Sequence, residues 1–80
     1  MRVELKLCAS LARFAPEGPG KEGTVLIEIP EGKTIGEILR GLKVPLESVK
    51  LVFLNGVHSD VNQVLREGDR VGVFPPVAGG

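Results

Sequence analysis

The 80-residue sequence contains no tryptophan, no tyrosine and only three phenylalanines, and its ten acidic residues balance its ten basic ones. Proteins of this size that bind nucleic acid usually carry a basic excess, or aromatic side chains spaced to stack on bases. We therefore expect no nucleic acid as a primary partner. The chain also lacks any apolar run near the roughly 18 residues that a membrane span needs, so no membrane association is predicted.

Cysteine and histidine are scarce as well. The single cysteine, Cys8, excludes an intramolecular disulfide and any zinc or iron–sulfur site held by four thiolates, and it is interpreted as a small buried residue rather than a reactive thiol. The single histidine, His58, has no second His or Cys at ligand spacing, so we predict a solvated loop residue and no metal site. The first residues contain no signal-peptide core, which favours a cytoplasmic protein.

Alternation of apolar and polar residues predicts most of the strands. It marks strands over residues 2–8, 24–29 and 70–74. A short apolar run over 51–54 predicts a buried strand, and Asn55-Gly56 after it is suited to a tight turn, because both residue types tolerate positive φ. Strands thus account for both ends of the predicted domain.

One helix is predicted near the middle of the sequence. Thr34 and Glu37 form a capping box, which places the helix start near residue 35. Four apolar residues follow at helical spacing and predict one face packed on the sheet: Ile35, Ile38, Leu39 and Leu42. Gly36 weakens such a helix, so we expect it to allow close approach to a neighbouring strand.

The remaining segments are predicted to connect the strands and the helix. Residues 11–15 suit about one helical turn, 16–23 form a loop rich in glycine and proline, and 57–66 suit a short strand with a connecting loop. The expected fold class is α+β, with a mixed four- to five-stranded sheet covered by one main helix. We expect one domain over residues 1–74 and a flexible or semi-rigid tail over 75–80.

The tail is the segment that the core does not explain. Pro75 and Pro76 favour an extended exit from the last strand, and the six residues to Gly80 span at most roughly 20 Å. Gly79 and Gly80 lack a Cβ, so this end of the chain can enter a narrow channel. Its α-carboxyl group, ionised above a pKa of about 3.3–3.7, can attack the α-phosphate of a nucleotide. The acyl-adenylate formed could accept sulfur or an amine.

This pattern resembles the ubiquitin-like β-grasp family of sulfur carriers over nearly the whole chain, and within it the MoaD type more than the thiamine carrier ThiS. The resemblance is carried by the order of elements and by Leu54-Asn55-Gly56, Asp60, Leu65, Gly68-Asp69-Arg70-Val71 and Phe74-Pro75-Pro76-Val77-Ala78-Gly79-Gly80. The connection from Ala9 to Gly23 also fits MoaD better, whereas residues 8–15 carry less charge than the helix usually found there.

The resemblance implies the site residues and partners. Gly80 is the residue that becomes adenylated and thiocarboxylated, and Gly79 lies in the same channel. The extended part of the tail and its docking surface are expected at Phe74, Pro75, Pro76, Val77 and Ala78. The implied partners are an E1-like adenylating enzyme of the MoeB type, which uses ATP, and a molybdopterin synthase large subunit of the MoaE type. The chain itself is expected to bind no cofactor.

Three functions stay open from the sequence. The first is a non-catalytic small subunit of molybdopterin synthase that donates sulfur for the molybdenum or tungsten cofactor. The second, resting on the same carboxylate chemistry, is a protein modifier or a carrier for thiamine or tRNA thiolation. The third is a passive interaction module with an inert tail. In each case the exposed sheet face, opposite the helix, is the expected docking surface.

Overall fold

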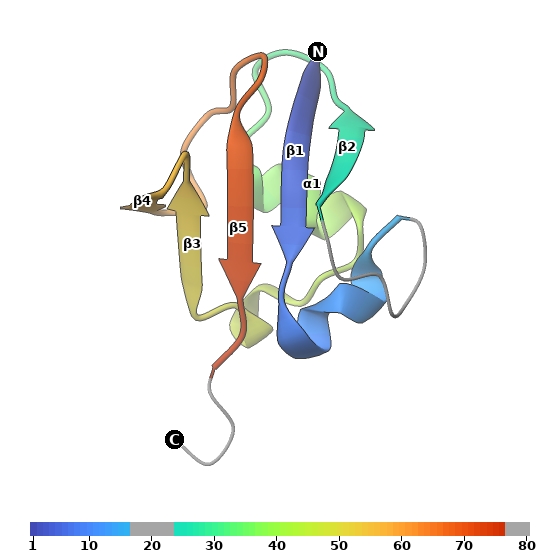
Figure 1. Ribbon diagram of the computed structural model, residues 1–80, viewed down its shortest axis with the longest axis vertical. Helices are drawn as coiled ribbons and strands as arrows, with labels where there is room; N and C mark the ends of the chain where they lie inside the picture. The colour runs from blue at the N-terminus through green and yellow to red at the C-terminus, as the bar shows by residue number, and fades with distance from the viewer. Residues whose placement is uncertain (17–23, 77–80) are drawn as a thin grey trace.

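The computed structural model describes residues 1–16 and 24–76, in which a five-stranded sheet carries an α-helix on one face (Figure 1). The elements occur in this order: β1 (Arg2–Leu7), a 3₁₀ helix (Ala9–Phe14), β2 (Val25–Glu28), α1 (Ile35–Gly41), a second 3₁₀ helix (Leu46–Ser48), β3 (Leu51–Leu54), β4 (Val57–Ser59) and β5 (Arg70–Phe74). The predicted α+β class and the predicted order of strands and main helix are confirmed.

The sheet is mixed, with the strand order β2-β1-β5-β3-β4. The last strand, β5, lies at its centre, parallel to β1 and antiparallel to β3, while β1 with β2 and β3 with β4 form antiparallel pairs (Figure 1). The segment that leads into the tail is therefore held by hydrogen-bonded strands on both sides. No helix within residues 1–16 and 24–76 is long and apolar enough to span a membrane.

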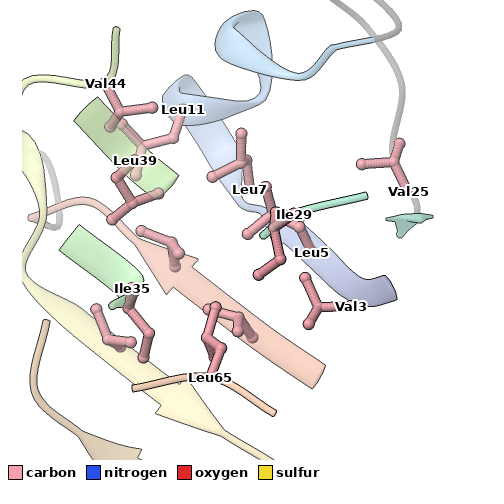
Figure 2. Packing of buried hydrophobic residues seen from close by; sticks show 13 residues of the cluster. Val3, Leu5, Leu7, Leu11, Val25, Ile29, Ile35, Leu39, Val44 and Leu65 are labelled. Atoms are coloured by element: carbon pink, nitrogen blue, oxygen red, sulfur yellow. The ribbon is translucent and has the colours of Figure 1, made fainter. Parts of the chain in front are cut away.

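The core lies between the sheet and α1, as Figure 2 shows. Side chains alternate across each strand, so every second residue of β1 and β5 points toward the helix. The helix contributes Ile35 and Leu39, and the other two residues of its predicted apolar face, Ile38 and Leu42, pack at the edge of the core. The buried residues are Val3, Leu5, Leu7, Leu11, Val25, Ile29, Ile35, Leu39, Val44, Val52, Leu65, Val71 and Val73.

The start of α1 is fixed by the predicted capping box. The backbone N–H of Glu37 donates to Thr34 Oγ1 at 3.1 Å, and the N–H of Thr34 donates to Glu37 Oε1 at 2.9 Å. The bond from the Thr34 backbone is the main reason that the pKa of Glu37 lies below its usual value. Local sequence thus sets where the helix begins, and the helix ends at Gly41.

Gly36 does allow a close approach, but the predicted neighbour was wrong. Its backbone N–H donates to the carbonyl oxygen of Val61 at 2.7 Å, and a Cβ on Gly36 would lie 3.2 Å from that oxygen. Val61 belongs to the loop that follows β4, not to a strand. The loop reaches the helix because Ile35 also donates to the carbonyl of Gln63, and Thr34 forms an isolated bridge with Val64.

Two further segments differ in detail from the sequence prediction. His58 is exposed, as expected, but it lies in β4 rather than in a loop, because β4 pairs with β3 along its whole length. The first helical turn begins at Ala9, two residues earlier than predicted, and is a 3₁₀ helix. Cys8 is half-buried rather than buried.

Candidate functional site

The root of the tail is held firmly at the end of β5. The carbonyl of Val73 accepts a hydrogen bond from the backbone N–H of Cys8 at 3.0 Å, and the carbonyl of Phe74 accepts one from Lys50 at 2.8 Å. Pro75 is half-buried and Pro76 is exposed. The tail therefore starts from a fixed point at one end of the sheet.

Of the seven predicted site residues, the structure places three. Phe74, Pro75 and Pro76 follow one another at the end of β5. The predictions made for Val77, Ala78, Gly79 and Gly80 lie outside the described residues. The part of the site that can be described is therefore the sheet face beside the tail root.

Phe74 belongs to an apolar cluster on the sheet face that α1 leaves uncovered. It lies opposite Leu51 on β3, and its ring meets that of Phe53 edge to face, with centroids 5.6 Å apart. The ring of His58 meets the other side of Phe53 at 5.8 Å. We call Leu51, Phe53 and Phe74 the outer patch. Leu51 is 39% exposed and Phe74 36%, so the outer patch is an accessible apolar surface next to the tail root.

A shallow depression of about 440 Å³ adjoins the outer patch. Its floor is Gly72, which the strand register places between Lys6 on β1 and Phe53 on β3. Arg70 and Glu4 line the same depression, on neighbouring strands. The uncovered sheet face therefore combines an apolar surface with charged groups of both signs.

The sequence predicted this face as the docking surface, and of the residues on it only Phe74 was among the predicted site residues. Phe53 and Leu51 were assigned to a buried strand, whereas β3 buries only Val52 fully. A usable signal was present in the sequence: an apolar residue stands on either side of Val52, so both faces of this strand are apolar.

Three of the remaining resemblance residues, Asn55, Asp69 and Arg70, hold the start of β5 in place. Asn55 takes a positive φ of 52° in the turn after β3, and its side-chain amide donates to Asp69 Oδ1 at 3.0 Å. The same side chain accepts from the backbone N–H of Arg70 at 2.9 Å. Asp69 Oδ2 in turn accepts from the N–H of Arg66 at 2.7 Å. This network ties the β3–β4 turn to the start of β5, so these residues serve the site by positioning its central strand.

Cys8 lies beside the tail root, because its backbone N–H donates to the carbonyl of Val73. Burial raises the pKa of its thiol, and the positive charge of Lys6 only partly opposes this effect. The thiol is therefore protonated at neutral pH to a greater degree than a free cysteine.

The raised pKa of the thiol predicts slow alkylation of Cys8 at neutral pH. Reaction with iodoacetamide requires the thiolate, so its rate should rise through a midpoint at higher pH than for the same cysteine in urea-unfolded chain. The alkylation rate, measured by mass spectrometry between pH 6 and about 10, checks the prediction. A folded chain that reacts faster than the unfolded one near pH 7 would contradict it.

No metal site is evident in the part of the chain that the structure describes. There, no three His, Cys, Asp or Glu side chains gather closely enough to hold an ion. The polar hollow beside β4, lined by His58, Ser59, Asp60, Asn62 and Gln63, is open to solvent.

The mixed sheet, the single main helix and the neighbouring structures define a ubiquitin-like β-grasp domain with the fold of the sulfur carriers. The model of the ThiS family matches residues 8–80. The chain belongs to the ThiS family. No significant match was found among curated proteins.

Three solved structures show the range of similar proteins. The small archaeal modifier protein 1 from Haloferax volcanii is 27% identical, with a TM-score of 0.70 and complete coverage of both chains. A putative molybdopterin converting factor subunit 1 from Pyrococcus furiosus is 25% identical, with a TM-score of 0.69 over 96% of this chain and 99% of that one. A complex of subunits 1 and 2 of the molybdopterin-converting factor from Helicobacter pylori matches at 31% identity and a TM-score of 0.57, again over both full chains.

Proposed function

We propose that this protein is a sulfur carrier whose Gly80 α-carboxylate is adenylated and then converted to a thiocarboxylate, and that it donates this sulfur in molybdopterin synthesis. The observation that carries the proposal is the family match, which extends through Gly79 and Gly80. Two of the similar structures are a molybdopterin converting factor subunit 1 and a complex of its subunits 1 and 2. Both support the molybdopterin pathway over other uses of the same chemistry.

The proposed chemistry needs only a carboxylate from this chain. An oxygen of the Gly80 carboxylate attacks the α-phosphorus of ATP and displaces pyrophosphate, which leaves an acyl-adenylate. The terminal sulfur of a persulfide attacks the acyl carbon, and AMP leaves. A thiol then cleaves the resulting acyl disulfide, is itself oxidised to a disulfide, and releases the thiocarboxylate. The nucleotide, the persulfide and the thiol all belong to partner proteins.

Two partners are proposed. An E1-like adenylating enzyme of the MoeB type would bind ATP and activate Gly80, and a large subunit of the MoaE type would receive the sulfur. The Helicobacter pylori neighbour was determined as a complex with its subunit 2, which supports the second partner. The outer patch of Leu51, Phe53 and Phe74 supports docking beside the tail, because aromatic side chains are enriched in protein interfaces. The proposed location is the cytoplasm, where ATP is available to the activating enzyme.

A second candidate function is a ubiquitin-like protein modifier, or a carrier for thiamine or tRNA thiolation. The Haloferax volcanii neighbour, which is named a small archaeal modifier protein, favours the modifier version. Modifier and carrier share the acyl-adenylate and differ in the nucleophile that follows: a lysine amine gives an isopeptide bond, whereas a persulfide gives the thiocarboxylate.

Reconstitution tests the proposal. The purified chain is incubated with ATP, a persulfide donor and the E1-like enzyme from the same cells, and its intact mass is followed. We expect Gly80 to exchange one oxygen for sulfur and the modified chain to convert the pterin precursor when the large subunit is added. A chain that never gains sulfur overturns the carrier function. Isopeptide adducts from Gly80 to lysines would move the assignment to the modifier.

A further inference from the structure

Gly72 occupies an unusual place for a glycine, the middle of the central strand. It pairs with Lys6 on β1 and with Phe53 on β3, so the sheet is continuous on both sides of it. Glycine weakens a strand interior, because it loses more backbone freedom on folding and has no side chain to pack. A glycine at this position therefore requires a reason.

The fold does not supply that reason. The glycines with positive φ among the described residues are Gly32, Gly56 and Gly68, so Gly72 has ordinary strand geometry. A Cβ built on Gly72 would lie 3.5 Å from Cε1 of Phe74, an ordinary van der Waals distance, with no other contact within 4 Å in the described part of the chain. Gly36, in contrast, is pressed against Val61. Glycine within a strand also marks close approach of a ligand or another chain, and that explanation remains for Gly72.

The surroundings of Gly72 indicate what approaches. The depression above it is bounded by the rings of Phe53 and Phe74 and by the charged side chains of Lys6, Arg70 and Glu4. In residues 1–16 and 24–76 the one ion pair joins Arg2 to Glu28 at 3.0 Å, so Lys6 and Arg70 have no carboxylate partner there. The depression is thus apolar at its base and carries two cations, neither in an ion pair, and one carboxylate. A partner surface with an apolar side chain next to an acidic one would be complementary to it.

We infer that the depression over Gly72 receives one apolar side chain of the activating enzyme, and that an acidic residue beside it pairs with Lys6 and Arg70. A partner that acts on Gly80 can reach this depression, because β5 runs from Gly72 directly into the tail, whose six residues span at most roughly 20 Å. We assign the depression to the activating enzyme because it is the first of the two proposed partners to act on Gly80. Glycine at position 72 then serves specificity, since any side chain there fills the space that the partner needs. The inference rests on the proposed function for the identity of this partner.

The decisive substitution is G72V, because the fold and the interface should respond to it in opposite directions. Valine favours strands and points into solvent here, so the melting temperature should stay equal or rise. The same side chain fills the depression, so the affinity for the activating enzyme should fall at least about tenfold. G72A should show both effects more weakly. G41A is the matched control, since a Cβ at Gly41 meets nothing within 4 Å and lies on the helix, away from the outer patch.

Charge reversal tests the second half of the inference. K6E should weaken binding at low salt, and the difference from the native chain should shrink as salt is raised, because the pairing is exposed to solvent. R40E makes the same change of net charge on α1, on the opposite side of the sheet, and should bind as the native chain does. Equal loss of affinity in both variants would contradict a local carboxylate contact.

The binding assay uses the E1-like enzyme from the same cells as the probe, and pyrophosphate exchange is measured in parallel. If the native chain binds and G72V and K6E bind more weakly, the inference is supported, whether or not pyrophosphate exchange is seen. If the native chain binds but shows no exchange, only the proposed activation is overturned. Binding that G72V and K6E leave unchanged overturns the inference and not the carrier function. A native chain that shows neither binding nor exchange overturns both.

Discussion

Removal of Gly79 and Gly80 is expected to abolish activation by the adenylating enzyme and to leave the folded domain intact. Truncation moves the carboxylate back to Ala78, which shortens the tail and places a Cβ beside the reacting carbon. The enzyme holds the carboxylate and the nucleotide in reacting distance, so a carboxylate displaced by two residues should lose essentially all of the rate. Pyrophosphate exchange, with ATP and the E1-like enzyme, measures this loss directly.

Stability provides the internal control for that truncation. The buried core of the described residues ends at Val73, so the melting temperature of the truncated chain should equal that of the native one. G80A restores the length and the carboxylate and adds one methyl group; it should be activated more slowly than the native chain but faster than the truncated one. If the truncated chain were activated at the native rate, Gly80 would not be the residue that carries the chemistry.

The second large effect is expected in the core. Leu39 is fully buried between α1 and the sheet, and L39A removes its side chain from the centre of the core (Figure 2). Such a substitution costs about 2–5 kcal/mol, because the lost transfer free energy is joined by that of a cavity. A domain of this size has a total stability of about 4–12 kcal/mol, so L39A should lose a large fraction of the free energy of unfolding. Urea denaturation followed by circular dichroism gives the free energy of unfolding.

L26A is the matched control for L39A. Leu26 lies on β2 and is 64% exposed, so the same chemical change removes little buried surface and should alter the free energy of unfolding by about 0.5 kcal/mol at most. If L26A and L39A lost the same free energy of unfolding, the core would not be the one described.

Local patterns explain why so much of the fold was predictable. The alternation in β1 and β5 and the capping box of Thr34 and Glu37 depend on neighbouring residues, and both are found as predicted. The Asn55-Gly56 turn is equally local, since both residues take the positive φ that the turn requires. Each of these signals can be recognised without knowing which strands pair.

The features that escaped prediction depend on long-range pairing. The depression exists because β5 lies between β1 and β3, which brings Lys6 and Phe53 to either side of Gly72. No local pattern indicates that arrangement. The contact of Gly36 with Val61 likewise arises from a loop folding back on the helix. The site residues beyond Pro76 were predicted from chemistry and resemblance alone, and they stay predictions.

The intact mass of the protein, recovered from its native cells under rapid denaturing conditions, tests the carrier function most directly. The account predicts a species heavier than the encoded chain by the replacement of one oxygen with sulfur, located at Gly80 by fragmentation and reverting to the encoded mass on hydrolysis. Conjugates joined through Gly80 to lysines of other proteins, with no sulfur-bearing species among them, would contradict it.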